Sequence, residues 1–558
     1  MTIQPTLADR SCSMVPASLG KLFCVWLMVI LCLKWPTLIE PPVWDAVWGL
    51  FPAAGDLADN GFNLPSLLTK PNCGMGGPNT HSESLVTWIT AVVLRFCGKG
   101  PRAFVVLHTL HFCAAAWMLA VLQRFLISIW GRGLAGVFTG MLLLCPLFRV
   151  QVGAMYFEIP LAACTVTAVV AYVTGHQGRA VFWATLGVLV KQTALILIGA
   201  LAVASFCQRG SLGKRCTRSL SFAICGFAAA FWPLISSTSA LTEIRVKPSG
   251  SFLQHMSLYH FQYLAAVPDI TAAFCLVALV GLIRLREVWL ALSNGPNLGP
   301  AAATGLLNQE SLEAKSDRTE PADKSTNYQT AASATGVSFL LVIMFALFIY
   351  VVPYFAHVGH LGLPRYFVFI LPFVFFALTQ WLKLLTSARL AMIVLTVVAI
   401  LFVGNREGLW YPKDPGDEIS VLERGENYRW LVVVQREAAQ AAANLPDDVV
   451  VYYGFAEHFF LKYPWQGYAD RTHPGGRCLA LREEKPESLN LKDFPKRFFV
   501  VYTNPRLFGY EAHKLLRNAT KDPSRQVQLF RRCQRGPYRI DIVEVTTIAK
   551  SELEQVTP

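Results

Sequence analysis

The stretch AVFWATLGVLVKQTALILIGALAVASF, residues 180–206, decides how this chain is organised. It is almost entirely apolar, and Lys191 is its only charged residue. About 20 apolar residues are enough to cross the roughly 30 Å of hydrocarbon in a bilayer. The stretch is therefore either one long membrane helix or two shorter helices that turn at Lys191. The distribution of positive charge along the rest of the chain distinguishes the two arrangements.

The composition of the whole chain is that of a membrane protein. Of its 558 residues, 54% are hydrophobic and only 15% are charged, and the mean hydropathy is +0.42. Soluble domains carry about 25% charged residues, so the polar surface here is too small for a water-soluble globule of this length. The same figures exclude a disordered, fibrous or small disulfide-stapled protein. The net charge of +13 is explained by basic residues in cytoplasmic loops, and no nucleic-acid partner is expected.

Positive charges assign the ends of the expected spans to two sides of the membrane. If residues 180–206 form a hairpin, the N-terminus and the basic residues between spans all fall on one side of the membrane. If they form a single helix, the basic loop after Phe206 falls on the opposite side from the other basic residues. The first span, residues 19–38, is expected to stay as an anchor because no small-residue cleavage site follows it. We therefore predict about eleven crossings, among them spans at 133–148, 267–283 and 336–354, with a cytoplasmic N-terminus and an outer C-terminus, in the plasma membrane. The residues that share the inner side are Arg124, Arg132, Arg179, Arg209, Lys214, Arg215, Arg218, Arg284, Arg286, Lys383 and Arg389.

The chain is expected to contain two domains. Residues 1–404 form a membrane domain with an outer loop at 40–101 and a cytoplasmic linker at 287–335, and residues 405–558 form a small extracytoplasmic α/β domain. Within the outer loop, residues 85–96 are apolar but too short to cross, which favours an interfacial or re-entrant helix. In the second domain we predict helices at 428–444 and 509–518 and strands at 449–453, 498–502 and 538–545. Cys478 and Cys533 either form a disulfide there or remain free thiols.

Several ionisable side chains are expected together at the outer membrane face, where such residues are functional candidates. Asp45 follows the first span, Glu158 opens another span, Lys191 stands at the hairpin tip, and Arg365 precedes a later span. Two acids and two bases on one face suit an anionic lipid head group and a hydroxyl that must be activated. Each residue alone is also explained by a side chain that snorkels to water. The loop before Arg365 adds His357 and His360.

The order of these features resembles a known family. An outward Asp follows the first span, and a long loop ends in a short amphipathic helix before a Gly. Aromatic-Glu-x-Pro, Gly-x-x-x-Lys and Arg-Tyr before a Pro-containing span then follow. This order is similar to that of the GT-C glycosyltransferases of the protein O-mannosyltransferase and aminoarabinose transferase group, which are multi-span enzymes that use polyprenyl-phosphate sugars. The resemblance covers about residues 19–403 and implies a GT-C-like multi-span α-helical fold.

The resemblance implies roles for the matching residues. Asp45 corresponds to the general base that acts on the acceptor hydroxyl, and Glu158 to a second acid that shapes the site. Lys191 and Arg365 correspond to cations that hold the lipid phosphate. The remaining substrate-binding candidates are His81, His357, His360, Asp56 and Asp59, of which the two aspartates compete with Asp45 for the role of first-loop acid. The chain departs from the family at Ala46, where a second acid is usual, and around His81, where the family often has His-Pro-Pro.

These observations together predict a membrane glycosyltransferase. It would move a sugar from a polyprenyl-phosphate donor to an outer glycan, lipid or protein acceptor by direct inverting displacement. The sequence has no Asp-x-Asp pair and no Gly-rich phosphate loop, so neither a nucleotide sugar, a metal nor another cofactor is expected. Two alternatives stay open: a transporter or flippase of a lipid-linked or anionic substrate, and a catalytically silent binding protein of the same fold.

Overall fold

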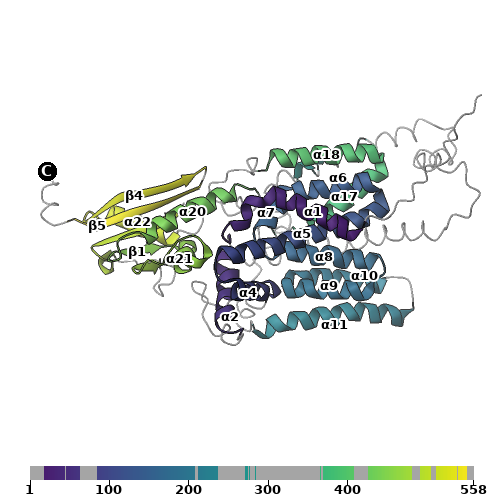
Figure 1. The fold of residues 1–558 in the computed structure, drawn as a ribbon, viewed down its shortest axis with the longest axis horizontal. Helices are drawn as coiled ribbons and strands as arrows, with labels where there is room; N and C mark the ends of the chain where they lie inside the picture. Colours follow the sequence, from purple (N-terminus) through teal and green to yellow (C-terminus); the bar gives the residue numbers. More distant parts are fainter. Residues whose placement is uncertain are drawn as a thin grey trace, which may run out of the picture.

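The structure is a computed structural model, and it describes most of the chain in two parts. The described residues are 18–43, 46–62, 84–207, 211–236, 365, 368–406, 425–479, 491–503, 510–536 and 538–548, with a few positions between 271 and 283. Residues 18–406 contribute a bundle of roughly aligned helices, and residues 425–548 contribute a sheet with helices on both faces (Figure 1). We call these parts the helix bundle and the sheet unit.

The helix bundle is made of long apolar helices whose inner faces bury leucine, phenylalanine and alanine. Two described helices, Leu19–Ile39 and Pro101–Trp130, are long and apolar enough to cross a membrane, or three if one bent pair is counted as a span. The predicted total of eleven crossings stays a prediction, since the segment 336–354 lies outside the described residues and 267–283 lies mostly outside them. The bundle helices are α1 Leu19–Lys34, α5 Pro101–Trp130, α6 Arg132–Leu144, α8 Glu158–Val173, α9 Gln177–Val190, α10 Leu195–Cys207, α11 Leu212–Ser236, α17 Leu371–Leu385 and α18 Ala388–Gly404.

The predicted turn at Lys191 is confirmed. Helix α9 ends at Val190, Lys191 is extended, and a short 3₁₀ turn, η3 (Gln192–Ala194), leads into α10. A Cβ built on Gly187 would lie only 3.4 Å from the Cβ of Ala194. In one continuous helix these residues would be about 10 Å apart along the axis. The chain therefore folds back, and residues 180–206 form a hairpin of two short helices.

The helix ends divide into two groups. At one end, the side-chain amide of Gln177 donates to the carbonyl of Arg218 over 3.5 Å, and Lys383 donates to the carbonyl of Ile129 over 3.4 Å. We call this the basic end, and its residues match the inner side predicted from charge. The other end faces the sheet unit (Figure 1), and we call it the sheet end. Helix α8 begins there with Glu158. The described members of the basic end are Arg124, Arg132, Arg179, Lys214, Arg215, Arg218, Lys383 and Arg389.

One predicted span has a different shape. Residues 133–148 were expected as a single helix, but α6 ends at Leu144 and a second helix, α7 (Pro146–Gly153), continues at an angle of 65°. Pro146 explains the bend, because its ring removes a backbone N–H and clashes with the preceding turn.

The outer loop contains more helix than was predicted. The expected short helix is present as α4 (Leu85–Cys97), and it is preceded by a π-helix, η2 (Ala46–Leu50), and by α2 (Phe51–Asp59). Ser84 caps α4, since its Oγ accepts from the amide of Val86, and the same hydroxyl donates to the carbonyl of Val190 over 2.7 Å. The start of α4 is thereby held beside the Lys191 turn.

The sheet unit is a mixed five-stranded sheet in the order β2-β1-β3-β5-β4. Strands β1, β2 and β3 are parallel, whereas β5 pairs antiparallel with β3 and β4, with a bulge between Leu529 and Arg531. Strand β3 is buried on both faces. The elements of the sheet unit are α20 Tyr428–Ala443, β1 Val450–Tyr453, α21 Phe455–Lys462, β2 Gly476–Cys478, β3 Arg497–Thr503, α22 Tyr510–Lys521, β4 Arg525–Arg535 and β5 Tyr538–Thr547, with 3₁₀ turns η5 Pro464–Gln466 and η8 Leu491–Asp493. A further 3₁₀ turn, η1 Trp35–Ile39, follows α1 in the helix bundle.

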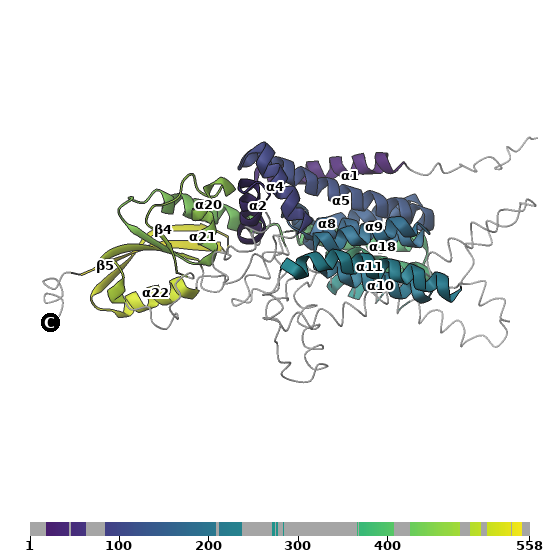
Figure 2. The same cartoon turned by 90° about the horizontal axis from the view of Figure 1, so that it is seen from below.

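Helices cover the two faces of this sheet separately. Helices α20 and α21 lie on one face and α22 lies on the other (Figure 2). Cys478 is on β2 and Cys533 is on β4, at opposite edges of the sheet, and the two are not bonded to each other. Four strand spacings of about 4.8 Å separate these edges, so the two thiols do not form the disulfide that the sequence left open.

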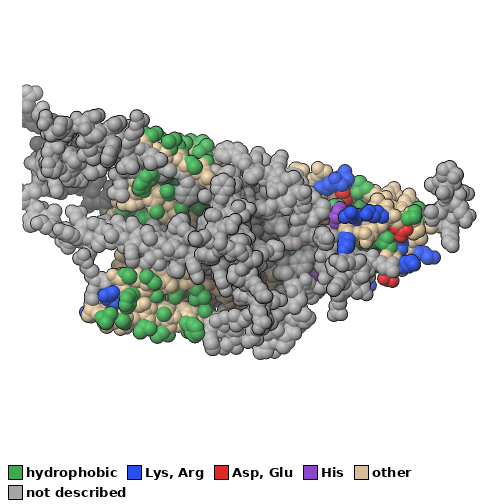
Figure 3. All heavy atoms as spheres, turned by 180° about the vertical axis from the view of Figure 1, so that it is seen from behind, with side chains coloured by type: hydrophobic (Ala, Val, Ile, Leu, Met, Phe, Trp, Pro, Cys, Tyr) green, Lys and Arg blue, Asp and Glu red, His purple; other side chains and the backbone are tan. Residues whose placement is uncertain are grey.

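The sheet unit packs directly on the outer loop. Tyr468 donates from its hydroxyl to the carbonyl of Pro42 over 2.8 Å, and the amide of Gln466 donates to the carbonyl of Val47 over 2.9 Å. Val47 and Val150 are buried in the same apolar cluster as the side chains of α20. Figure 3 shows hydrophobic side chains gathered over the bundle and charged ones mostly over the sheet unit.

Candidate functional site

A buried charge cluster lies at the sheet end of the bundle. Lys191 Nζ donates to Glu158 Oε1 over 2.7 Å, and Arg365 Nε lies 3.8 Å from the same oxygen. The Glu158 and Arg365 side chains are 2% and 5% exposed, whereas Lys191 is 16% exposed. Lys191 is therefore the member of the cluster that is most open to a ligand. The three residues come from the start of α8, the end of α9 and the segment before α17.

Helix ends explain why the charges are tolerated. Glu158 is the first residue of α8, where the helix dipole favours a negative charge, and Lys191 caps the C-terminus of α9, where it favours a positive one. Just before α8, Met155 has a φ of +49°, which is uncommon for a residue with a side chain. This left-handed turn leads the chain from α7 into Tyr156, Phe157 and Glu158.

Aromatic rings form a wall beside the two cations. The ring centroid of Tyr156 lies 5.7 Å from Lys191 Nζ and 5.1 Å from Arg365 Cζ, and that of Phe157 lies 5.9 Å from Lys191 Nζ. Both rings are almost fully buried. Cations over aromatic faces within about 6 Å are stabilised without being neutralised. The cluster therefore carries two cations and one carboxylate in a largely dry setting.

Two histidines on α5 connect this cluster to the first loop. His111 Nε2 lies 2.8 Å from the carbonyl oxygen of Tyr156, and His108 Nε2 lies 3.3 Å from the carbonyl oxygen of Glu40. The histidines are three residues apart, so about 4.5 Å of helix axis separates them. The segment that carries Glu40 is therefore a near neighbour of the Glu158 cluster.

A second charge network joins the bundle to the sheet unit. Glu426, just before α20, pairs with Lys34 at 2.7 Å, with Arg149 at 2.9 Å and with Arg406 at 2.8 Å. Lys34 and Arg149 are buried, whereas Arg406 is half exposed. Burial acts to raise the pKa of Glu426, but the three cations outweigh it and leave that pKa below its usual range.

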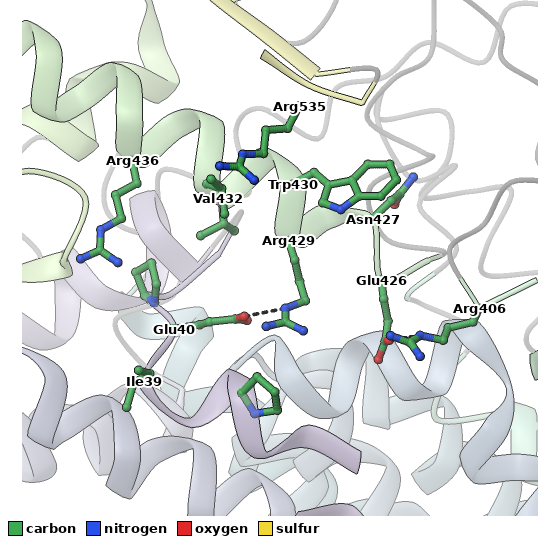
Figure 4. A pocket seen from close by; sticks show the side chains of 13 residues that line it. Ile39, Glu40, Arg406, Glu426, Asn427, Arg429, Trp430, Val432, Arg436 and Arg535 are labelled. Atoms are coloured by element: carbon green, nitrogen blue, oxygen red, sulfur yellow. Dashed lines mark hydrogen bonds and ion pairs between the residues drawn. The ribbon is translucent and has the colours of Figure 1, made fainter. Parts of the chain in front are cut away.

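A pocket of about 390 Å³ opens at this junction, and we call it the seam pocket. Figure 4 shows Glu40 bonded to Arg429 on its floor, with Arg436 and Arg535 extending toward the same space from the sheet unit. The Arg429 Nε to Glu40 Oε1 distance is 2.6 Å. Burial raises the pKa of Glu40, and Arg429 offsets this only in part. Four arginines and two glutamates line the pocket, so its charge favours an anion: Arg406, Arg429, Arg436, Arg535, Glu40 and Glu426.

The structure places some of the predicted site residues and not others. Glu158, Lys191 and Arg365 are brought together, and their predicted roles remain predictions. Asp45, His81, His357 and His360 lie outside the described residues. Asp56 and Asp59 are on α2. Asp59 forms a 2.6 Å ion pair with Lys99, and both of these side chains are partly exposed to solvent. Neither aspartate has a described bond to the Glu158 cluster. Among the described residues, no three His, Cys, Asp or Glu side chains gather as metal ligands do.

Sequence reasoning missed the aromatic wall and the Glu426 network. Tyr156 and Phe157 directly precede Glu158, so an aromatic pair next to a buried acid was an available signal. No comparable signal existed for Lys34 and Glu426, which are 392 positions apart in the chain.

Comparison with known proteins gives structural similarity only. No protein-family profile matches the chain, and no curated protein sequence matches it. Two solved structures are similar over nearly the whole length. One is ArnT from Cupriavidus metallidurans bound to undecaprenyl phosphate, at 13% identity and a TM-score of 0.45. The other is the apo state of ArnT from the same organism, at 13% identity and a TM-score of 0.42. Each alignment covers 94% of this chain and 98% of that one.

Proposed function

We propose that this protein is an integral membrane glycosyltransferase that transfers a sugar from a polyprenyl-phosphate donor to an acceptor outside the cytoplasm. The observation that carries the proposal is the Glu158, Lys191 and Arg365 cluster at one end of an apolar helix bundle. Among the described residues, Lys191 and Arg365 are two cations beside one carboxylate, a setting that suits the phosphate of a lipid-linked donor. Ionisable groups buried at the end of an apolar bundle are costly, which favours a functional reason for their presence.

The proposed chemistry is a single displacement at the anomeric carbon. The acceptor oxygen forms a bond to that carbon as the bond to the phosphate oxygen breaks, and the phosphate leaves on its lipid. Lys191 and Arg365 stabilise the charge that grows on the departing phosphate, and they do so more strongly in a dry site than in water. Glu158 orients both cations. Asp45, just before η2, takes the proton of the acceptor hydroxyl. Direct displacement inverts the anomeric configuration.

The acceptor side of the proposal is the seam pocket. Its floor residue Glu40 is linked through His108 to α5, one turn from His111 and the Glu158 cluster. Arg429, Arg436 and Arg535 would bind a carboxylate or phosphate of the acceptor, because the planar guanidinium matches both groups in a bidentate manner. In this view the sheet unit, outside the cytoplasm, supplies the arginines, and the plasma membrane supplies the donor.

A transfer assay tests this function. The full chain in nanodiscs is incubated with a radiolabelled polyprenyl-phosphate hexose or with the matching nucleotide sugar, together with an envelope extract as the acceptor source. We expect label to move covalently from the lipid-linked donor and not from the nucleotide sugar, and we expect Lys191→Gln to reduce this transfer at least tenfold.

A matched variant and two further results decide the outcome. Lys99→Gln also removes an ion-paired lysine from the sheet end but leaves the cluster intact, so it should transfer normally. Equal loss in both variants would contradict the assignment of Lys191. Accumulation of substrate inside proteoliposomes without covalent transfer would instead support a transporter. Tight donor binding with no transfer to any fraction would support a silent binding protein.

A further inference from the structure

A second large cavity lies at the basic end of the bundle, away from the proposed active site. It is a groove of about 750 Å³ between α5, α8 and α9, with Leu19 at the start of α1 on its edge. Helix α9 runs from this groove to the Lys191 turn, and its 14 residues span about 20 Å. The basic-end groove is therefore a separate site from the Glu158 cluster.

The mouth of the groove is positively charged. Arg124 from α5 and Arg179 from α9 line it, together with His176. Both arginine side chains are exposed, and neither forms a hydrogen bond or an ion pair with any described residue. No aspartate or glutamate is among the described residues that line the groove. Two guanidinium groups without counter-charge are suited to a phosphate group.

The rest of the groove is apolar and aromatic. Trp117 and Trp183 stack at 6.2 Å between ring centroids, and Trp117 Nε1 donates to Thr167 Oγ1 over 3.1 Å, which fixes the ring. Val121 and Val170 continue the apolar lining. Trp117 is seven residues from Arg124 on α5, or about 10 Å along the axis. This length accommodates the first part of a hydrocarbon chain beneath a charged head group.

We propose that the basic-end groove binds one anionic phospholipid, with its phosphate between Arg124 and Arg179 and an acyl chain against Trp117 and Trp183. The location agrees with this ligand, because the basic end is the side predicted to face the cytoplasm, where anionic lipids are concentrated and basic pockets between helices bind them. A polyprenyl phosphate carries the same head-group chemistry. The donor, however, is expected at the opposite end, where Lys191 and Arg365 lie, so the phospholipid is the occupant that fits this place.

Native mass spectrometry of the full chain with added lipids tests the proposal. Protein stripped of co-purified lipid is titrated with phosphatidylglycerol, with phosphatidylcholine of the same acyl chains, and with undecaprenyl phosphate. We expect one phosphatidylglycerol to bind at least tenfold more tightly than phosphatidylcholine, and the double variant Arg124→Gln/Arg179→Gln to lose this preference. Arg389→Gln, an exposed arginine at the same end but outside the groove, should keep it.

A second readout places the lipid. Phosphatidylglycerol with brominated acyl chains should quench part of the tryptophan fluorescence of the parent chain. The fraction of the fluorescence that is quenched should be smaller in the Trp117→Phe/Trp183→Phe variant. The proposal is overturned if the double arginine variant binds phosphatidylglycerol as the parent does. It is also overturned if both phospholipids bind alike, or if undecaprenyl phosphate displaces phosphatidylglycerol from the groove. Because Arg124 and Arg179 lie outside the proposed active site, the double variant should retain sugar transfer, so this inference can fail without the proposed function failing.

Discussion

Replacing Glu426 with Gln tests whether the buried network holds the sheet unit on the helix bundle. The wild-type carboxylate pairs with Lys34, Arg149 and Arg406. In the wild-type protein, the Lys34 and Arg149 side chains are 3% and 8% exposed, and neither has another ion pair among the described residues. The replacement would therefore leave both buried charges without a counter-charge. Removing one partner from a buried ion pair costs about 3–5 kcal/mol, because it leaves an uncompensated charge in a dry setting. At about 1.4 kcal/mol per factor of ten, the opening equilibrium of the junction should rise between roughly 10²- and 4 × 10³-fold.

Hydrogen exchange measured by mass spectrometry can detect this change locally. The amides of α20, which follows Glu426 directly, should exchange faster by that factor, while those of α22 on the far face of the sheet should change little. Arg406→Gln is the matched control, since Arg406 is a partner of the same carboxylate but its own side chain is 51% exposed. An exposed pair contributes about 0–1 kcal/mol, so exchange should rise less than about sixfold. The reasoning is refuted if Arg406→Gln accelerates α20 exchange as much as Glu426→Gln, or if Glu426→Gln has no effect.

Three further perturbations address the proposed site and its pH dependence. Lys191→Gln should weaken binding of a polyprenyl phosphate at least tenfold in a binding titration, whereas Lys99→Gln should leave it within about twofold; equal weakening would contradict a direct phosphate contact. Asp45→Asn should remove most sugar transfer while donor binding in the same titration stays nearly unchanged, and full retention of turnover would exclude it as the base. Burial raises the pKa of Glu40. Protonation of Glu40 therefore contributes to the free energy of unfolding at low pH, and this contribution is lost as the pH rises through the raised pKa. The lowered pKa of Glu426 has the opposite sign: its stabilisation is present above the ordinary pKa and is lost as the pH falls through the lowered value. Difference infrared spectra should therefore show the Glu40 carboxyl protonating at a higher pH than that of Glu426, with each band assigned by its loss in the glutamine variant; the reverse order would refute both shifts.

The features that the sequence predicted correctly depend on local pattern or on charge. A lysine in the middle of a long apolar run predicted the break at Lys191, and the approach of Ala194 to Gly187 confirms it. The prediction that the basic segments between spans share one side also predicted which helix ends lie together. The hydrogen bond from Gln177 to the carbonyl of Arg218, between the starts of α9 and α11, is one example. The predicted helix at 428–444 is present as α20, and the predicted strands at 449–453, 498–502 and 538–545 are present as β1, β3 and β5, because each carries a clear periodic or apolar signal.

The features that were missed depend on tertiary context. Strand β4 was not predicted because it is a mostly exposed edge strand rich in Arg and Gln, with adjacent charges at Arg531 and Arg532 that hide the period-two pattern. Charged side chains on an edge strand disfavour pairing with other chains. The bend at Pro146 was missed because an apolar run hides where a helix changes direction. The network around Glu426 joins segments that are hundreds of residues apart, and no sequence rule connects such residues in a single chain.

Photocrosslinking of a donor analogue tests the central claim most directly. A polyprenyl phosphate with a diazirine next to the phosphate is irradiated with the full chain in nanodiscs, and the labelled residues are mapped by mass spectrometry. We predict labelling of the segment from Tyr156 to Glu158 and of the turn at Lys191, with a loss of at least tenfold in Lys191→Gln. Labelling confined to the basic-end groove, or spread evenly over the lipid-facing helices and unchanged in Lys191→Gln, would contradict the claim that these cations hold the lipid phosphate.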